Sequence, residues 1–378
     1  MESFRNGSHG EKAFTLIELM MVTAMLGLII PVMILLFSKV SQGMAADEMH
    51  GQLKKLNELT MLRLDTHIKA NKHMFQNDAS NVTFLSKVGL MGAPAVLAGS
   101  HLPLVQPVQP EPTPTSFSPN SLAAPLNFGN CLLFGAYDSP TTIAGKGYRA
   151  PLVVSGASVT YAGASGPATM IIDLYRFYYY YLTTSTHPLK GVQSHGLVEW
   201  RSVQYADFYQ LKNITDPTLK VAVIKWMTSA ANFPGGNPVT LAWDSGQTTP
   251  YDSVVPIFAF YQLNNATGTW TGIANPTILQ ADFTYLTQIP SGILSRGFNY
   301  GICGNNIPPT YAWPESPPVK VPMYGTASGN YPGGFEVGLK GSAGGMEVLT
   351  RCLLVAKGGA LKVPWNDITM IHNARDVW

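Results

Sequence analysis

The chain has 378 residues, of which 46% are hydrophobic and 12% are charged, with a formal net charge of +2. The charged fraction is about half the ~25% of an average soluble protein, and the near-neutral balance gives no electrostatic reason to expect a nucleic-acid partner. The apolar content argues against disorder, so the composition indicates one large folded domain or two.

A polar segment at residues 1–13 is followed by a long apolar run. Between residues 19 and 37 only Thr23 and Pro31 interrupt a series of apolar residues and glycine. Because about 20 apolar residues in a helix cross a ~30 Å hydrocarbon core, the run predicts a membrane-spanning helix. Glu18 at its leading edge would cost roughly 2.5–3.5 kcal/mol at a bilayer centre, so we expect this carboxylate to have a partner.

The start of the run reads Phe-Thr-Leu-Ile-Glu-Leu-Met at residues 14–20. It resembles the N-terminus of type IV pilins and type II secretion pseudopilins, in which a polar leader precedes a long hydrophobic helix. The resemblance implies that residues 1–13 are a prepilin leader. It implies that a prepilin peptidase cleaves between Ala13 and Phe14 and methylates the new amino group of Phe14. It also implies that Glu18 pairs with the terminal amine of a neighbouring subunit during assembly.

The same residues allow two other interpretations. Thr15 and Glu18 have the spacing of a capping box, in which two side chains satisfy amides at the start of a helix. A signal peptidase could also cut after Ala45, which small residues precede, although the apolar run exceeds the usual ~7–15-residue core of a signal peptide. The resemblance itself has two departures: Ala13 replaces the usual Gly, and Pro31 precedes the usual kink position.

Residues 14–75 are predicted to form one long helix, with a membrane or filament-core part at 14–37 and an amphipathic part at 38–75. Pro31 is expected to kink the first part because it removes a backbone hydrogen bond. A helical wheel of the second part separates apolar from charged residues, as in a helix that buries one stripe against a globular body. The apolar stripe comprises Met49, Leu53, Leu56, Leu64, Ile68, Met74 and Phe75, and the charged side comprises Lys54, Lys55, Glu58, Asp65 and Lys69.

Prolines crowd the next segment, residues 76–126. The sequence at residues 106–114 favours an extended polyproline conformation. We therefore expect this segment to be a long exposed connection between the helix and the head.

The remaining residues, 127–378, predict a β-rich and largely antiparallel head, so the expected fold class is α+β with a pilin-like head. Runs of β-branched and aromatic residues indicate strands, of which the first two are expected to pair. The predicted strands are residues 169–182, 197–211, 221–227, 254–263 and 278–289. Residues 335–339 and 347–355 flank a Gly-Gly pair and predict a hairpin.

The hairpin and the pairing of Tyr-rich residues 177–182 with Leu-Val-Glu-Trp-Arg at 197–201 also resemble J-type minor pseudopilins. The resemblance implies a minor, non-enzymatic subunit whose partners are other pilin or pseudopilin subunits, the prepilin peptidase and the bacterial inner membrane. The chain would span that membrane once, with a cytoplasmic N-terminus and a periplasmic head, before entering a pilus or pseudopilus.

No motif predicts a catalytic residue, a metal site or a cofactor. The chain lacks HExxH, P-loop and GxSxG patterns. Asp244 and Asp252 are expected to be turn residues rather than calcium ligands. Cys131, Cys303 and Cys352 can form at most one disulfide within the chain, and burial as small apolar residues is the other interpretation.

The aromatic content keeps a different class of protein open. A membrane-anchored or secreted β-rich adhesive or ligand-binding protein would present several of the 7 tryptophans as exposed coplanar rings. The simpler expectation is that most of these rings lie in the core, because aromatic side chains bury large apolar areas.

Overall fold

The chain divides into two compact units, Met1–Met49 and His50–Trp378. The computed structural model describes residues 15–76, 81, 94–96, 100, 102–103, 105–106, 128–138, 149–153, 159–161, 164–166, 169–184, 194–230, 237–247, 251–252, 257–286, 299–303, 335–342, 345–357 and 365–374.

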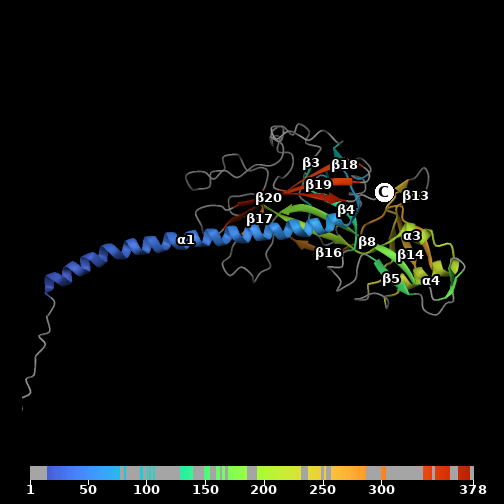
Figure 1. Cartoon of the computed structure of the whole chain (residues 1–378), viewed down its shortest axis with the longest axis horizontal. Helices are drawn as coiled ribbons and strands as arrows, with labels where there is room; N and C mark the ends of the chain where they lie inside the picture. The colour runs from blue at the N-terminus through green and yellow to red at the C-terminus, as the bar shows by residue number, and fades with distance from the viewer. Residues whose placement is uncertain are drawn as a thin grey trace, which may run out of the picture. The chain divides into compact units, whose positions relative to one another are not determined.

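In the first unit the described residues form the N-terminal part of helix α1, which spans Leu16–Lys69. Figure 1 shows α1 as one continuous ribbon. The helix runs through Pro31. The Thr23 hydroxyl donates a hydrogen bond to the Leu19 carbonyl of the same helix at 2.9 Å. The apolar run is therefore a helix, while a kink at Pro31 stays a prediction.

In the second unit residues 50–69 of α1 bury one stripe against the head. Leu53, Leu64 and Ile68 are fully buried, while Lys54 and Glu58 are exposed. This separation confirms the predicted amphipathic stripe for these residues. Leu56 lies at the edge of the stripe and is only half-buried.

The predicted helix end at residue 75 is wrong. α1 ends at Lys69, and Asn71–Met74 form strand β1, which pairs antiparallel with β4 (Leu132–Tyr137). Phe75 extends this pairing, since its amide donates to the Leu133 carbonyl at 3.0 Å. A helical wheel finds buried residues here but cannot distinguish the two conformations, because partners far along the chain decide that Met74 and Phe75 are extended.

Strand β8 (Thr169–Thr184) is the centre of the head sheet. It pairs antiparallel with β4 on one side and with β9 (Ser194–Ser202) on the other, with Tyr180 opposite Glu199. The predicted pairing of the Tyr-rich run with the Leu-Val-Glu-Trp-Arg run is therefore confirmed. Residues 203–211, predicted to continue the second strand, instead contain a break, β10 (Tyr205–Asp207) and the short helix α3 (Phe208–Lys212).

The C-terminal hairpin is also confirmed. β18 (Phe335–Ser342) and β19 (Gly345–Lys357) pair antiparallel, with Ser342 opposite Gly345. β20 (Trp365–Ala374) pairs with the other edge of β19, and β17 (Asn299–Cys303) links β19 to β9.

The other described strands extend this sheet, border it or form two separate two-stranded sheets. Beyond β10 the sheet continues through β11, β14 and β15, while β16 borders β9. The strands are β2 (Val105–Gln106), β3 (Phe128–Gly129), β5 (Arg149–Val153), β6 (Val159–Tyr161), β7 (Ala164–Gly166), β11 (Leu241–Trp243), β12 (Tyr251–Asp252), β13 (Ile257–Phe258), β14 (Phe260–Asn264), β15 (Thr269–Gly272) and β16 (Gln280–Tyr285).

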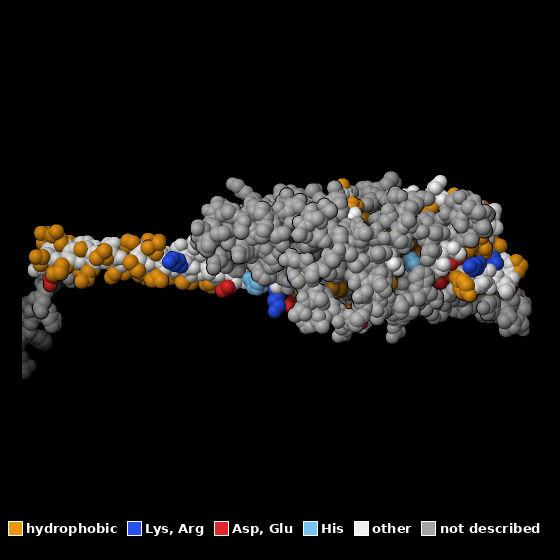
Figure 2. All heavy atoms as spheres, turned by 90° about the horizontal axis from the view of Figure 1, so that it is seen from above, with side chains coloured by type: hydrophobic (Ala, Val, Ile, Leu, Met, Phe, Trp, Pro, Cys, Tyr) orange, Lys and Arg blue, Asp and Glu red, His pale blue; other side chains and the backbone are white. Residues whose placement is uncertain are grey.

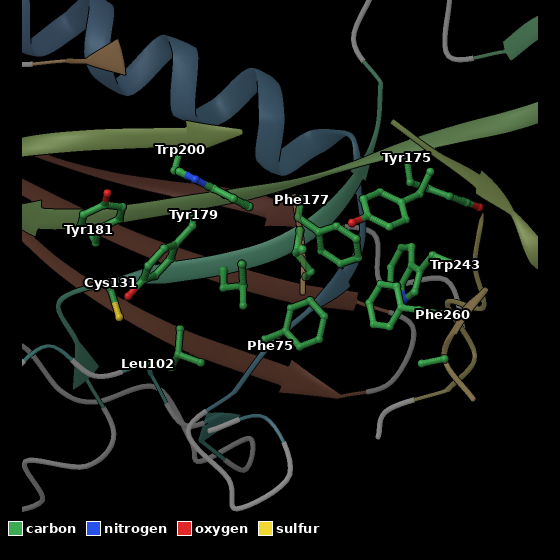
Figure 3. Close-up of a cluster of buried hydrophobic side chains, with 14 of the residues drawn as sticks. Phe75, Leu102, Cys131, Tyr175, Phe177, Tyr179, Tyr181, Trp200, Trp243 and Phe260 are labelled. Carbon is green, nitrogen blue, oxygen red and sulfur yellow. The ribbon is translucent and has the colours of Figure 1, made fainter. Parts of the chain in front are cut away.

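The alternation of β8 separates two packed faces. Tyr175, Phe177, Tyr179 and Tyr181 point into an aromatic cluster that also contains Trp243 (Figure 3). The intervening residues face the other way, where Tyr178 and Tyr180 meet α1 and Ile172 and Leu174 pack with the helical segment that follows β10. One strand thus carries both layers of the core.

The predicted strand at residues 221–227 is wrong, because this segment belongs to helix α4 (Pro217–Met227). Asp216 caps the helix, its carboxylate accepting from the amides of Thr218 and Leu219 at 2.8 and 3.2 Å, and Pro217 occupies the first turn. The buried Leu219, Val223, Ile224 and Met227 recur at helical spacing. The cap and the tertiary burial outweigh the β propensity of the two valines and the isoleucine.

Pieces of the proline-rich connection pack onto the head instead of being exposed. Leu102 is 1% exposed within the aromatic cluster, and β2 pairs in parallel with β18. Tyr181 donates to the Pro94 carbonyl at 2.9 Å, and Thr183 donates to the Ala95 carbonyl at 2.5 Å. Residues 107–127, which hold most of the polyproline run, lie outside the described residues.

Candidate functional site

The start of α1 is built as a capping box. The Thr15 amide donates to Glu18 Oε2 at 3.0 Å, and Thr15 Oγ1 donates to the same oxygen at 2.9 Å. Glu18 is the acidic residue of the first turn, where a carboxylate also suits the helix dipole. Thr15 and Glu18 therefore form the capping contact that their spacing predicts. Ala13 and Phe14, the expected cleavage site, lie outside the described residues.

The helix that follows exposes its apolar side chains on every side. Figure 2 shows hydrophobic groups along the visible face of this part of α1, and the run contains a candidate membrane span by length and composition. A helix that is apolar all round is suited to a hydrocarbon environment or to other apolar helices. The exposed large residues are Leu16, Ile17, Leu19, Met20, Met21, Val22, Met25, Leu26, Leu28, Ile29, Ile30, Val32, Met33, Ile34, Leu35, Leu36, Phe37, Val40 and Met44.

Inside the second unit, a buried carboxylate anchors α1 to the sheet. Glu199 on β9 is fully buried, and Arg63 of α1 binds it with two bonds, Nε to Oε2 at 2.8 Å and Nη2 to Oε1 at 2.7 Å. Tyr180 Oη donates to Glu199 Oε2 at 2.9 Å. Arg201 Nε lies 3.7 Å from Glu199 Oε1, and its guanidinium binds both oxygens of Asp282 at 2.7 and 2.6 Å. Together with His67, we call these residues the Glu199 network.

His67 extends the network along the helix. Its Nδ1 lies 2.6 Å from Tyr180 Oη. Because the single proton of Tyr180 goes to Glu199, His67 Nδ1 must carry the proton that it donates to Tyr180. The ring also stacks on Tyr178 with 4.3 Å between centroids. Burial lowers the pKa of His67 from 6.5 to about 4, and the nearby Arg63 adds to this lowering while Glu199 opposes it.

A second polar contact joins the same helical turns to the C-terminal strands. His372 of β20 places Nδ1 2.9 Å from Asp65 Oδ1 of α1 and Nε2 2.7 Å from Thr350 Oγ1 of β19. Asn57 donates to the Cys352 carbonyl at 3.0 Å and to Asn366 Oδ1 at 2.9 Å. Residues 50–69 are thus held at two separated sets of strands, and these polar contacts fix their register on the sheet.

The described residues show no group of His, Cys, Asp or Glu that could hold a metal ion. Asp244 is a turn residue, as predicted, since its carboxylate accepts from the Gly246 amide at 3.2 Å and pairs with Lys212 at 3.1 Å. The side chain of Asp252 lies outside the described residues.

The cysteines with described side chains are buried thiols. Cys131 and Cys352 are both fully buried, and burial raises the pKa of Cys131 to about 12. The Tyr179 hydroxyl lies beside the Cys131 sulfur in the aromatic cluster (Figure 3). These two residues follow the expectation of small apolar groups, while the side chain of Cys303 lies outside the described residues.

Tryptophans with described side chains do not form an exposed platform. Trp200 and Trp243 are fully buried, and Trp226 and Trp270 are half-buried against the α3–α4 cluster. The remaining tryptophan side chains lie outside the described residues. Trp200 and Trp243 therefore lie in the core, as expected for large aromatic side chains.

No sequence motif predicted the Glu199 network. Arg63 and Glu199 are 136 residues apart, and each sits in a segment whose pattern predicts only an amphipathic helix or a strand. The one available signal was Glu199 itself, an acidic residue inside a run of apolar strand residues.

Comparisons with known protein families, with curated proteins and with solved structures found no match. Within the described residues, the structure shows a β-rich head and an N-terminal helix that is long and apolar enough to span a membrane.

Proposed function

We propose that this chain is a minor, non-enzymatic structural subunit of a type IV pilus or a type II secretion pseudopilus. It is inserted into the bacterial inner membrane by α1, processed by a prepilin peptidase between Ala13 and Phe14, and then assembled with other pilin or pseudopilin subunits. Its head is periplasmic before assembly.

The observation that carries the proposal is the apolar part of α1. Nineteen large apolar side chains between Leu16 and Met44 are exposed, which a hydrocarbon environment or neighbouring apolar helices would cover. The Phe-Thr-Leu-Ile-Glu sequence at residues 14–18 resembles the pilin start, and it places Glu18 where that family has its assembly carboxylate.

The attachment of α1 to the head also supports a structural role. A filament subunit must transmit force between its helix and its head, and the Glu199 network joins residues 50–69 of α1 to the sheet by charged hydrogen bonds to a fully buried carboxylate.

Glu18→Gln separates assembly from helix capping. Glutamine preserves the capping box because its side-chain oxygen can still accept from Thr15, but it removes the charge that would pair with a terminal amine. We expect the variant to insert into the native membrane and to carry N-methylated Phe14, while its amount in sheared filaments falls at least about tenfold, the factor for ~1.4 kcal/mol of lost pairing. Quantitative mass spectrometry of membrane and filament fractions gives both readouts.

Glu58→Gln is the matched control, because Glu58 is an exposed carboxylate of the same helix, 3.9 Å from Lys54, and its change should leave incorporation unaltered. Normal incorporation of Glu18→Gln would refute the assembly role of the carboxylate. A wild-type chain that starts at Ala46 would refute the pilin interpretation and favour a secreted adhesive or ligand-binding head. An intact Met1 would refute prepilin processing.

A further inference from the structure

The polar contacts of residues 50–69 in α1 include two buried histidines that have different hydrogen-bond partners. One set, the Glu199 network, contains a histidine that donates to a tyrosine, which donates to a carboxylate already bound by an arginine. The other set contains His372, which lies directly on the carboxylate of Asp65. Both histidines are buried, so a proton added to either one must be accommodated inside the protein.

We propose that the Glu199 network is an acid-sensitive clasp, in which protonation of His67 releases residues 50–69 of α1 from strands β8 and β9. The proposal goes beyond the assembly role and does not depend on it.

The hydrogen-bond directions decide where the added proton goes. His67 Nδ1 already carries a hydrogen, which it donates to Tyr180, so acid protonates Nε2 and makes the ring a cation. The ring is 3% exposed and stacks on Tyr178. Little water can therefore reach the new charge while the helix stays in place.

The carboxylate of the network cannot compensate this charge. Glu199 lies 3.6 Å from His67 Nδ1, but its negative charge is already balanced by the two bonds from Arg63. Burial outweighs what remains of the attraction. The titratable and charged groups that face His67 are Arg63 on α1, Tyr178 and Tyr180 on β8, Glu199 and Arg201 on β9, and Asp138 after β4.

The direction of the pH effect follows from the two protonation states. With α1 in place the pKa of His67 is about 4, whereas a released His67 titrates near 6.5. The clasp is thus fully stable above pH 6.5, and it weakens as the pH falls from 6.5 towards 4, because only the released state takes up the proton in this range.

The contact of His372 is built to tolerate acid better. A protonated His372 can donate Nδ1–H to Asp65 and Nε2–H to Thr350, so the cation keeps both hydrogen bonds. Burial lowers its pKa, but the Asp65 carboxylate opposes that effect, and Lys69 is the other charge that acts on it. His372 therefore supplies a matched comparison in which a buried histidine of the same interface has a smaller effect.

The test is hydrogen–deuterium exchange of the full chain in nonionic detergent between pH 7.5 and 5, with labelling times scaled to the chemical exchange rate. Peptides from residues 50–69 are compared with peptides from β8 and β9. Proton uptake at His67 alone should raise the equilibrium constant for opening of the helix about 30-fold between pH 7.5 and 5. This factor follows because the pKa of His67 is 6.5 when the helix is released and about 4 when it is attached. The strands should keep their protection.

His67→Asn places an amide donor near the position of Nδ1 and removes the titration, so its helix protection should no longer depend on pH. His372→Gln should retain most of the dependence. Helix protection in the wild type that is constant between pH 7.5 and 5 overturns the proposal, as does simultaneous loss of protection in β8 and β9, which would mean global acid unfolding. If His67→Asn does not fold, the wild type alone tests the proposal, through the difference in exchange protection between residues 50–69 and strands β8 and β9.

Discussion

Glu199 shows how one buried charge determines the position of a helix. Its carboxylate is fully buried, and a buried ion needs several charged or polar partners to offset the loss of hydration. Arg63 and Tyr180 supply them from two different elements. The side chain of Arg63 remains 37% exposed, whereas that of Glu199 is fully buried. Solvent therefore reaches the arginine side of the ion pair.

At this scale we predict that Arg63→Met destabilises the head by about 3 kcal/mol, the lower end of the range for breaking a buried pair. The lower end applies because Tyr180 still donates to Glu199 and Arg201 lies nearby. Urea unfolding of the full chain in detergent, followed by the fluorescence of buried Trp200 and Trp243, measures the change.

Lys54→Met is the control for this change, since Lys54 and Glu58 are both more than half exposed and such a pair contributes about 0–1 kcal/mol. An equal loss in the two variants would show that Glu199 does not depend on Arg63.

The sequence separation between two contacting residues decides whether their contact could be predicted. Thr15 and Glu18 are three residues apart, so their capping contact follows from local spacing and could be predicted. Arg63 and Glu199 are 136 residues apart, so only the fold brings them together. His67 likewise gave no signal, because its partners Tyr178 and Tyr180 belong to a strand more than a hundred residues away.

Among the elements, α4 is one that the sequence pattern misidentified. Its apolar residues have high β propensity, and a short apolar run does not distinguish a strand from a buried helix. The overlooked local signal was Asp216 followed by Pro217, a capping residue with proline at the first helical position. The long strand β8 and the C-terminal hairpin were predictable because their runs are longer and richer in β-branched and aromatic residues.

At the element scale we predict that Asp216→Ala destabilises the chain by about 1 kcal/mol, the usual cost of losing an N-cap. The substitution removes the acceptor of two amides at the start of α4. Thermal unfolding monitored by circular dichroism measures the effect, and Asp216→Asn, which keeps an acceptor, should recover most of it. A full-sized loss in Asp216→Asn would argue against the capping role.

For the molecule as a whole, the division into two units separates an apolar helix from a packed head. Two hydrophobic clusters of described residues lie in the second unit, whereas the first unit exposes large apolar side chains between Leu16 and Met44. The exposed apolar surface of the first unit is suited to hydrocarbon or to other apolar helices, whereas the second unit buries apolar clusters within itself.

At this scale we predict that a chain beginning at residue 50 moves from the membrane to the soluble fraction, because it lacks the candidate membrane span. Carbonate extraction of membranes followed by immunoblotting measures the partition. Full-length Glu18→Gln is the control and should stay in the membrane. Retention of the truncated chain in carbonate-washed membranes would mean that the head itself binds lipid.

Features that depend on neighbours along the chain follow from the local sequence. These are the apolar helix, its capped start at Thr15, the amphipathic stripe up to residue 69 and the strongest strands, because periodicity and capping act over a few residues. Tertiary structure decided the rest. It ended α1 at Lys69 by pairing residues 71–74 with β4, and it buried Glu199 beneath Arg63. These outcomes depend on the free energy of contacts between distant segments, which no local pattern contains.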